Sequence, residues 1–342
     1  MKKCVFACLI CLSIPLLSIA QNQPGLGKKI LFIRGGDGSG GLGSGDDTHL
    51  SDITDFSTNG GNRGWGTLAS ILEAEGYTLE QIKEGSDGDT PVDLSSLNLS
   101  QYAVVVFGSN NATYESSTVD VWLDYINQGG AALFISDANF GSNWNDAPSS
   151  DNHFLPRIGW EVNQDAGTYD LDTFEDPNHP ILSGLNSIGG EGVSPITVKD
   201  YNVSGVSSTI LIKVPSGRNV RRITNNDSRG STTSATPDDA VLVIADVGSG
   251  RVAGHFDRNT FFNENGAGGR DITKQDHSQY ARNLFNWLAG VNADAPNQEP
   301  SVQITTLQDG FTFNVGAKII VAANINEKSG GHGLSIWITD IG

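Results

Sequence analysis

The sequence predicts an α/β fold in which a mostly parallel sheet carries helices on both faces. Across residues 28–290, short apolar runs alternate with segments of helical periodicity. The apolar runs lack the polar alternation of a half-exposed sheet, as expected for strands that are covered on both faces. Residues 301–323 instead alternate apolar and polar residues between turn signals, which predicts a short all-β segment.

The first elements follow from local periodicity. Residues 29–34 (KILFIR) form an apolar run that ends at a glycine pair, and this pattern predicts a buried strand. Residues 64–75 place apolar side chains at helical spacing, and Gly76 stands where a helix C-cap is expected. Residues 77–83 are predicted to form the next strand.

A second strand–helix–strand run follows. Residues 103–108 (AVVVFG) predict a strand buried on both faces, and an apolar stripe over residues 119–126 predicts a helix that stops at Gly129. Residues 131–135 predict another buried strand. Residues 141–235 are polar and are predicted to be loop-rich insertions.

The last elements of the α/β region are a hairpin and a helix. Residues 240–245 and 251–255 predict two strands that are joined by a turn at residues 248–250. Residues 278–288 predict the final helix because their apolar residues fall on one face. Residues 291–300 are polar and contain proline, which predicts a linker.

The first twenty residues have the pattern of a secretory signal peptide. Two lysines precede an apolar stretch, and a small-x-small cleavage site at residues 18–20 predicts cleavage before Gln21. The alternative is a membrane anchor, but the apolar run is short for a span of about 20 residues. We therefore expect a secreted or cell-surface protein. All three cysteines lie in this segment, so no disulfide is expected in the mature chain: Cys4, Cys8 and Cys11.

The charge balance excludes one class of partner. The chain has 39 acidic and 21 basic residues, and removal of Lys2 and Lys3 leaves 19 basic residues and a net charge of −20. Nucleic-acid binding depends on neutralising phosphates with lysine and arginine, so we expect no nucleic-acid partner. No later segment is long and apolar enough to predict a membrane span.

Several segments together resemble a known superfamily. They are KILFIRGG at 29–36, YAVVVFGSNN at 102–111, GGAALFISDANFG at 129–141, DPNHPILSGL at 176–185 and GRVAGHFDRNTFF at 250–262. These segments resemble the flavodoxin-like sheet of the class I glutamine amidotransferase-like superfamily, nearest to its ThuA-like and uncharacterised secreted branches. The segment from residue 300 to 325 resembles the start of a bacterial Ig-like repeat. It is incomplete, because such a sandwich needs about 100 residues.

The resemblance implies where catalytic residues would lie. The superfamily's nucleophile turn corresponds to residues 136–139, where this chain has no cysteine, so thioester amidotransferase chemistry is excluded. The superfamily's His-x-Glu pair has a counterpart in His255 and Asp257. Ser136 or Asp137 with these two residues makes a candidate hydrolytic site. The alternative, which we favour, is that these side chains only hydrogen-bond one another and nearby loops.

Open α/β sheets bind ligands outside the carboxyl ends of their strands. Trp144 follows one such strand end, and its ring could stack on a sugar, while Arg34 and Arg270 could add positive charge. We expect the following residues to contact a ligand there: Asp37, Asn110, Asn139, Trp144, Arg258 and Asn259.

The glycine-rich segment 35–47 does not predict a phosphate loop. It follows a strand, but it lacks the phosphate-loop lysine and contains aspartates that repel phosphate. We expect a loop at the rim of the cleft. An alternative assigns Ca²⁺ to Asp46, Asp47 and Asp52 with Asp37, or more weakly to residues 86–89. Neither segment has EF-hand spacing and the histidines are dispersed, so no metal site or cofactor is expected.

Two functions remain open at this point. The first is an exported, non-enzymatic module that binds a ligand, with a glycan as the expected class. The second is a hydrolase acting on carbohydrate-derived substrates through a residual Ser/Asp-His-Asp site. The missing thiol and the Ig-like segment favour the first.

Overall fold

The computed structural model describes most of residues 23–291 and three short strands beyond them. The described residues are 23–35, 52–54, 56, 63–85, 90–108, 110, 112–137, 147–164, 167–223, 231–263, 270–291, 303–304, 319–324 and 333–338. The chain divides into two compact units, Met1–Ala293 and Asp294–Gly342.

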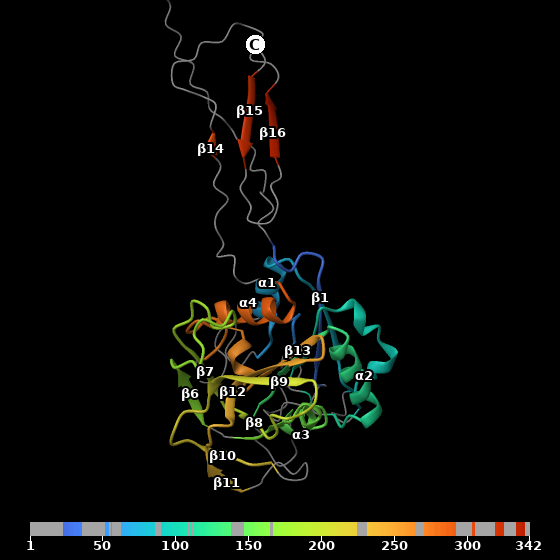
Figure 1. The fold of residues 1–342 in the computed structure, drawn as a ribbon, viewed down its shortest axis with the longest axis vertical. Helices are drawn as coiled ribbons and strands as arrows, with labels where there is room; N and C mark the ends of the chain where they lie inside the picture. The colour runs from blue at the N-terminus through green and yellow to red at the C-terminus, as the bar shows by residue number, and fades with distance from the viewer. Residues whose placement is uncertain are drawn as a thin grey trace, which may run out of the picture. The chain divides into compact units, whose positions relative to one another are not determined.

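A nine-stranded mixed sheet forms the centre of the first unit (Figure 1), in the order β2-β1-β3-β4-β13-β12-β8-β5, with β9 also paired to β12. The first five strands in this order are parallel neighbours. Their order is the 2-1-3-4-5 order of flavodoxin-like sheets, with β13 as the fifth strand. These strands are β1 (Lys29–Arg34), β2 (Thr78–Lys83), β3 (Val104–Gly108), β4 (Ala131–Ile135) and β13 (Gly250–His255).

The rest of the sheet is antiparallel. The predicted hairpin is confirmed: β12 (Asp239–Val247) turns at Gly248 and Ser249 into β13. The loop-rich prediction for residues 141–235 is wrong in part, because three of its segments join the main sheet beside β12. Two of the three are only three residues long, too short for a periodic pattern. The segments are β5 (Trp160–Val162), β8 (Ile196–Val198) and β9 (Val206–Lys213).

The same region adds two small hairpins and a short helix outside the main sheet. One hairpin pairs β6 with β7, and the other pairs β10 with β11. Their bounds are β6 (Thr168–Leu171), β7 (Ile188–Glu191), β10 (Asn219–Arg221), β11 (Thr232–Ser234) and α3 (Ala147–Asp151). Short 3₁₀ helices span Leu94–Ser96, Leu99–Gln101, Leu155–Ile158 and Asn259–Phe261.

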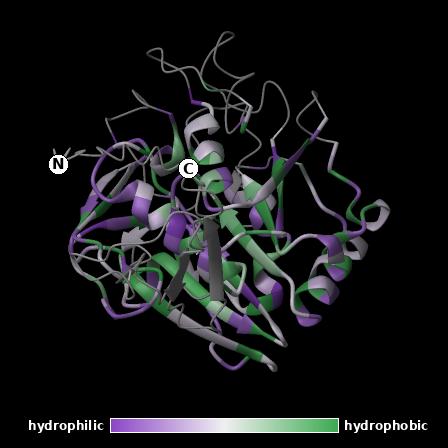
Figure 2. Cartoon of the chain, turned by 90° about the horizontal axis from the view of Figure 1, so that it is seen from above, coloured by the Kyte–Doolittle hydropathy of each residue, from purple (hydrophilic) through white to green (hydrophobic). Residues whose placement is uncertain are grey.

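Helices cover both faces of the parallel strands. Ile30 and Phe32 of β1 belong to one core cluster with α1 (Gly66–Ala74) and α4 (His277–Leu288). Leu31 and Ile33 belong to a second cluster with α2 (Ser116–Asn127). Successive side chains of a strand point to opposite faces, so the uniformly apolar run builds both cores. In Figure 2 the central strands are coloured largely green, the colour of hydrophobic residues.

The helix ends agree with the sequence prediction. Gly76 after α1 has φ +94° and Gly129 after α2 has φ +105°, a backbone conformation that favours glycine. None of the helices in the described part of the chain is long and apolar enough to cross a membrane.

The second unit contains a three-stranded antiparallel sheet, which agrees with the all-β character predicted for this segment. Its strands are β14 (Gln303–Ile304), β15 (Ile319–Asn324) and β16 (Gly333–Ile338). An Ig-like sandwich needs a second sheet, and the Ig-like assignment stays a prediction.

Candidate functional site

Buried polar side chains gather where the parallel strands end. Each of the five strands is followed at its carboxyl end by at least one such residue, and open α/β sheets bind ligands at this edge. The residues are Arg34 at the end of β1, Glu84 after β2, Asn110 after β3, Ser136 and Asp137 after β4, and Asp257 and Arg258 after β13. We call this region the carboxyl edge.

An ion pair between Asp137 and Arg258 joins two neighbouring strands at this edge. Both residues are only 2% exposed. Arg258 also lies over the ring of Phe262, 6.0 Å from its centroid. Removing one partner of a buried pair leaves a desolvated charge, so the two residues depend on each other. The turn after β4, where the sequence resemblance predicted a nucleophile position, therefore contains a carboxylate that is engaged with arginine.

Asp257 is held by the backbone. Its carboxylate accepts hydrogen bonds from the N–H groups of Glu191 (2.7 Å) and Asn259 (2.9 Å). A Cβ atom on Gly190 would lie 2.4 Å from the Asp257 carboxylate oxygen, so only glycine allows this approach. Burial raises the pKa of Asp257 well above its usual range, and the neighbouring charge of Asp137 adds to this rise. Asp257 thereby ties β7 and the turn after β13 together.

His255 is fully buried among aromatic rings. Its Nδ1 lies 2.9 Å from the hydroxyl of Tyr280, and its ring is 5.0 Å from that of Phe261. Burial lowers the pKa of His255 to about 3, so the ring is neutral near pH 7. The backbone of Asp257 opposes this lowering of the pKa, although Nε2 makes no hydrogen bond of ordinary geometry with the described residues. Among the described residues, no hydrogen bond joins the His255 ring to the Asp257 carboxyl group.

The acidic residue beside Ser136 is Asp151, which was not among the candidate site residues. Burial raises the pKa of Asp151 in α3 well above its usual range; the Ser136 hydroxyl opposes this rise and the charge of Glu84 adds to it. Glu84 accepts hydrogen bonds from the Tyr114 hydroxyl (2.7 Å) and the Asn110 amide (3.0 Å). The structure thus brings the candidate residues Ser136 and Asn110 close to two buried acids.

Sequence reasoning missed both of these acids. Glu84 follows a predicted strand directly, so its position at a strand end was a usable signal. Asp151 lies in a region that was predicted to be loop-rich, and no local pattern indicated its burial.

Other candidates have structural partners. Asn259 donates its side-chain amide to the carbonyl of Glu191 (3.0 Å), which fixes the turn after β13. Asp52, a candidate Ca²⁺ ligand, pairs with Arg34 and accepts hydrogen bonds from Gln81 and Thr54. Arg270 pairs with Asp170 of β6 (2.8 Å). This hydrogen bond raises the pKa of Arg270, and the nearby charge of Asp257 at the carboxyl edge adds to the rise.

Some candidates cannot be placed. Asp37, Asp46, Asp47, Asn139, Trp144 and residues 86–89 lie outside the described residues. Within the described ranges, no group of three or more histidine, cysteine, aspartate or glutamate side chains is arranged to hold a metal ion.

Comparisons with known proteins give structural neighbours only. No family model matches the chain, and no curated protein sequence matches it. The mmIFT52 N-terminal domain has a TM-score of 0.47 at 14% identity, with 76% of this chain and 97% of that chain covered. A ThuA-like protein from Bacteroides uniformis has a TM-score of 0.39 at 12% sequence identity, with 77% of this chain and 92% of that chain covered. A ThuA-like protein from Parabacteroides merdae has a TM-score of 0.39 at 15% sequence identity, with 77% of this chain and 90% of that chain covered. Structural neighbours thus include ThuA-like proteins at low identity; export and the Ig-like repeat stay predictions.

Proposed function

We propose that this chain is an exported, non-catalytic module that binds carbohydrate at its carboxyl edge. The observation that carries the non-catalytic part is the buried Asp137–Arg258 ion pair at the turn where a nucleophile would lie. A carboxylate already neutralised by an adjacent guanidinium is a weak nucleophile toward an ester or glycoside. The pair instead fixes two strand ends rigidly, and a pre-organised rim lowers the entropy cost of binding.

The partners of His255 support the same conclusion. A general base must reach the proton that it accepts within hydrogen-bond distance, and its pKa works best near the operating pH. His255 is hydrogen-bonded to Tyr280 in the helix-covered core, and burial lowers its pKa to about 3. The alternative function, a hydrolase acting on carbohydrate-derived substrates through Ser136 or Asp137 with His255 and Asp257, would need a different arrangement of this ring.

The carbohydrate part of the proposal rests on residue chemistry. Planar polar side chains suit the hydroxyl groups of a sugar, and the carboxyl edge is built on two of them: Asn110, held by Glu84, and Arg258, held by Asp137. Both are buried, so they order the edge against which a sugar would bind. The sequence predicts that Trp144 follows the strand end of residues 131–135, and an indole ring suits stacking on a pyranose ring. The acidic chain as a whole disfavours polyanionic ligands.

A glycan array with three forms of the mature protein tests the proposal. The wild type is expected to retain at least one glycan, and Trp144→Ala should weaken that binding by about tenfold or more, as expected for loss of an aromatic anchor. Trp287→Ala is the matched control, because Trp287 packs against Arg251 at the start of β13, the opposite end of the strand. No glycan retained by the wild type would overturn the carbohydrate assignment. Release of reducing sugar from such a glycan would favour the hydrolase.

A further inference from the structure

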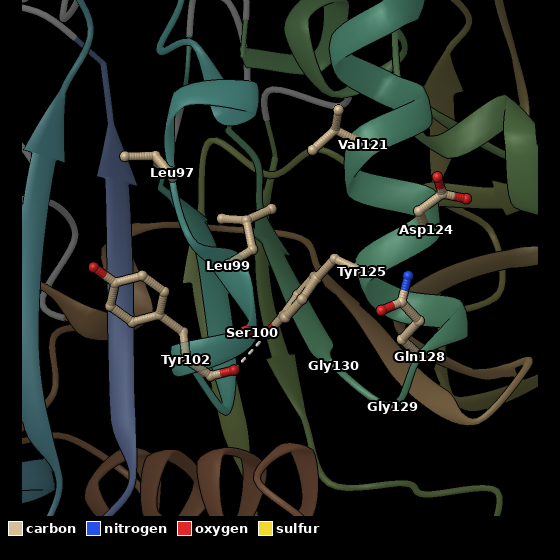
Figure 3. Close-up of a pocket in the computed structure, with 10 residues that line it drawn as sticks. All are labelled: Leu97, Leu99, Ser100, Tyr102, Val121, Asp124, Tyr125, Gln128, Gly129 and Gly130. Atoms are coloured by element: carbon tan, nitrogen blue, oxygen red, sulfur yellow. Dashed lines mark hydrogen bonds between the residues drawn. The ribbon is translucent and has the colours of Figure 1, made fainter.

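A separate hollow lies at the opposite edge of the same strands. It has a volume of about 420 Å³ and opens between the segment before β3 and helix α2 (Figure 3). Tyr102 precedes β3 and Gly130 precedes β4, so the hollow is at the amino ends of strands whose carboxyl ends bear Asn110 and Asp137. Binding there is therefore independent of the function proposed above.

The floor of this hollow is preformed. The Tyr125 hydroxyl lies 3.1 Å from the carbonyl oxygen of Tyr102 and accepts a hydrogen bond from the N–H of Ala131 (3.2 Å). The Tyr125 ring packs directly over Gly130, where a Cβ atom would lie 2.3 Å from ring carbons. The ring is thus held from both ends, and a ligand would meet a surface that needs little reordering.

The walls combine apolar surface with a single charge. Leu97 and Leu99 line one side, and Val121 lines the other along α2 (Figure 3). Asp124, one turn after Val121, is the only charged side chain among the described residues that line the hollow, and Gln128 follows it at helical spacing. Asp124 is exposed, and among the described residues its carboxylate makes no hydrogen bond or ion pair.

We propose that this hollow binds small organic ammonium ions that carry an apolar body. An apolar body gains free energy by covering the leucine and valine side chains. An ammonium group at the rim donates hydrogen bonds to the Asp124 carboxylate, a charge-assisted contact that a neutral ligand lacks. An anion is disfavoured by the Asp124 charge, and the described residues that line the hollow include no lysine or arginine. The net charge of −18 also raises the local concentration of cations.

Calorimetric titration with phenethylamine and its neutral analogue 2-phenylethanol tests this proposal on the full chain. The two probes share an aromatic body and differ in the charged group. We expect phenethylammonium to bind with a dissociation constant on the order of 1 mM, about fivefold tighter than the alcohol, the upper range for an exposed ion pair. Added salt should reduce this preference, because exposed charges are screened.

Two matched variants assign the preference to the hollow. Asp124→Asn should abolish the preference for the amine, since it removes the charge and retains the shape. Asp120→Asn is the same substitution one turn earlier on α2, where the carboxylate pairs with Arg157 (2.7 Å) outside the hollow, and it should leave the preference intact. Equal binding of both probes, no binding of either, or equal effects of the two variants would overturn the proposal. Because sugars are proposed to bind at the other edge, Asp124→Asn should leave glycan retention unchanged.

Discussion

Replacement of His255 by glutamine should remove an acid-dependent loss of stability. His255 is fully buried, and burial lowers its pKa from the ordinary 6.5 to about 3. As the pH falls below 6.5, His255 becomes protonated in the unfolded chain, whereas in the folded protein it stays neutral until about pH 3. The free energy of unfolding contributed by His255 is therefore intact above pH 6.5 and is lost progressively between pH 6.5 and pH 3.

The size of this loss follows from the difference of about 3.5 pH units. At about 1.4 kcal/mol per unit the full loss is about 5 kcal/mol, and about 3.4 kcal/mol of it falls between pH 6.5 and pH 4. Two buried acids, Asp151 and Asp257, change stability in the opposite direction over this range, because their raised pKa values favour proton uptake by the folded state. Subtracting the His255→Gln values from those of the wild type removes these shared contributions.

Urea unfolding of both proteins at pH 7, 6, 5 and 4 measures the effect. The stability advantage of the wild type over His255→Gln should shrink steadily as the pH falls. Tyr280→Phe is the control: it removes the hydrogen bond at Nδ1 but keeps the ring buried, so it should lose stability at every pH and retain the acid dependence. An advantage that stays constant from pH 7 to pH 4 would refute the assignment of His255 as a buried neutral ring.

Two further predictions concern the carboxyl edge. Asp151→Asn should gain stability relative to the wild type as the pH rises above about 4, because ionising a buried acid of raised pKa destabilises the folded wild type there. Urea unfolding at pH 5 and 8 checks this. The same difference in unfolding free energy between the two proteins at both pH values would contradict it. Arg258→Met should cost about 3–5 kcal/mol by leaving Asp137 without its arginine partner. Asp137→Asn in the same chain should recover part of that loss, whereas simple additivity of the two substitutions would show that they are not coupled.

The order of the parallel elements was largely predictable from the sequence. A strand that is covered on both faces must be apolar throughout, so the apolar runs at residues 29–34, 103–108 and 131–135 were sufficient to predict three buried strands. Gly76 and Gly129 mark helix ends because the backbone there adopts positive φ. The extension of the sheet by β5, β8 and β9 was not predictable in this way. Their pairing with one another and with β12 depends on partners far away in the chain.

The sequence by itself determined which polar residues follow which strands, and it excluded thiol chemistry outside the first eleven residues. It placed Ser136, Asp137, His255 and Asp257 at strand ends. Only the tertiary structure decided their partners: Arg258 for Asp137, Tyr280 for His255, backbone N–H groups for Asp257 and the unforeseen Asp151 beside Ser136. The physical reason is that these contacts join segments that are separated along the chain. Burial shifts the pKa values of these side chains, and it depends on how distant segments pack, so no local sequence pattern predicts it.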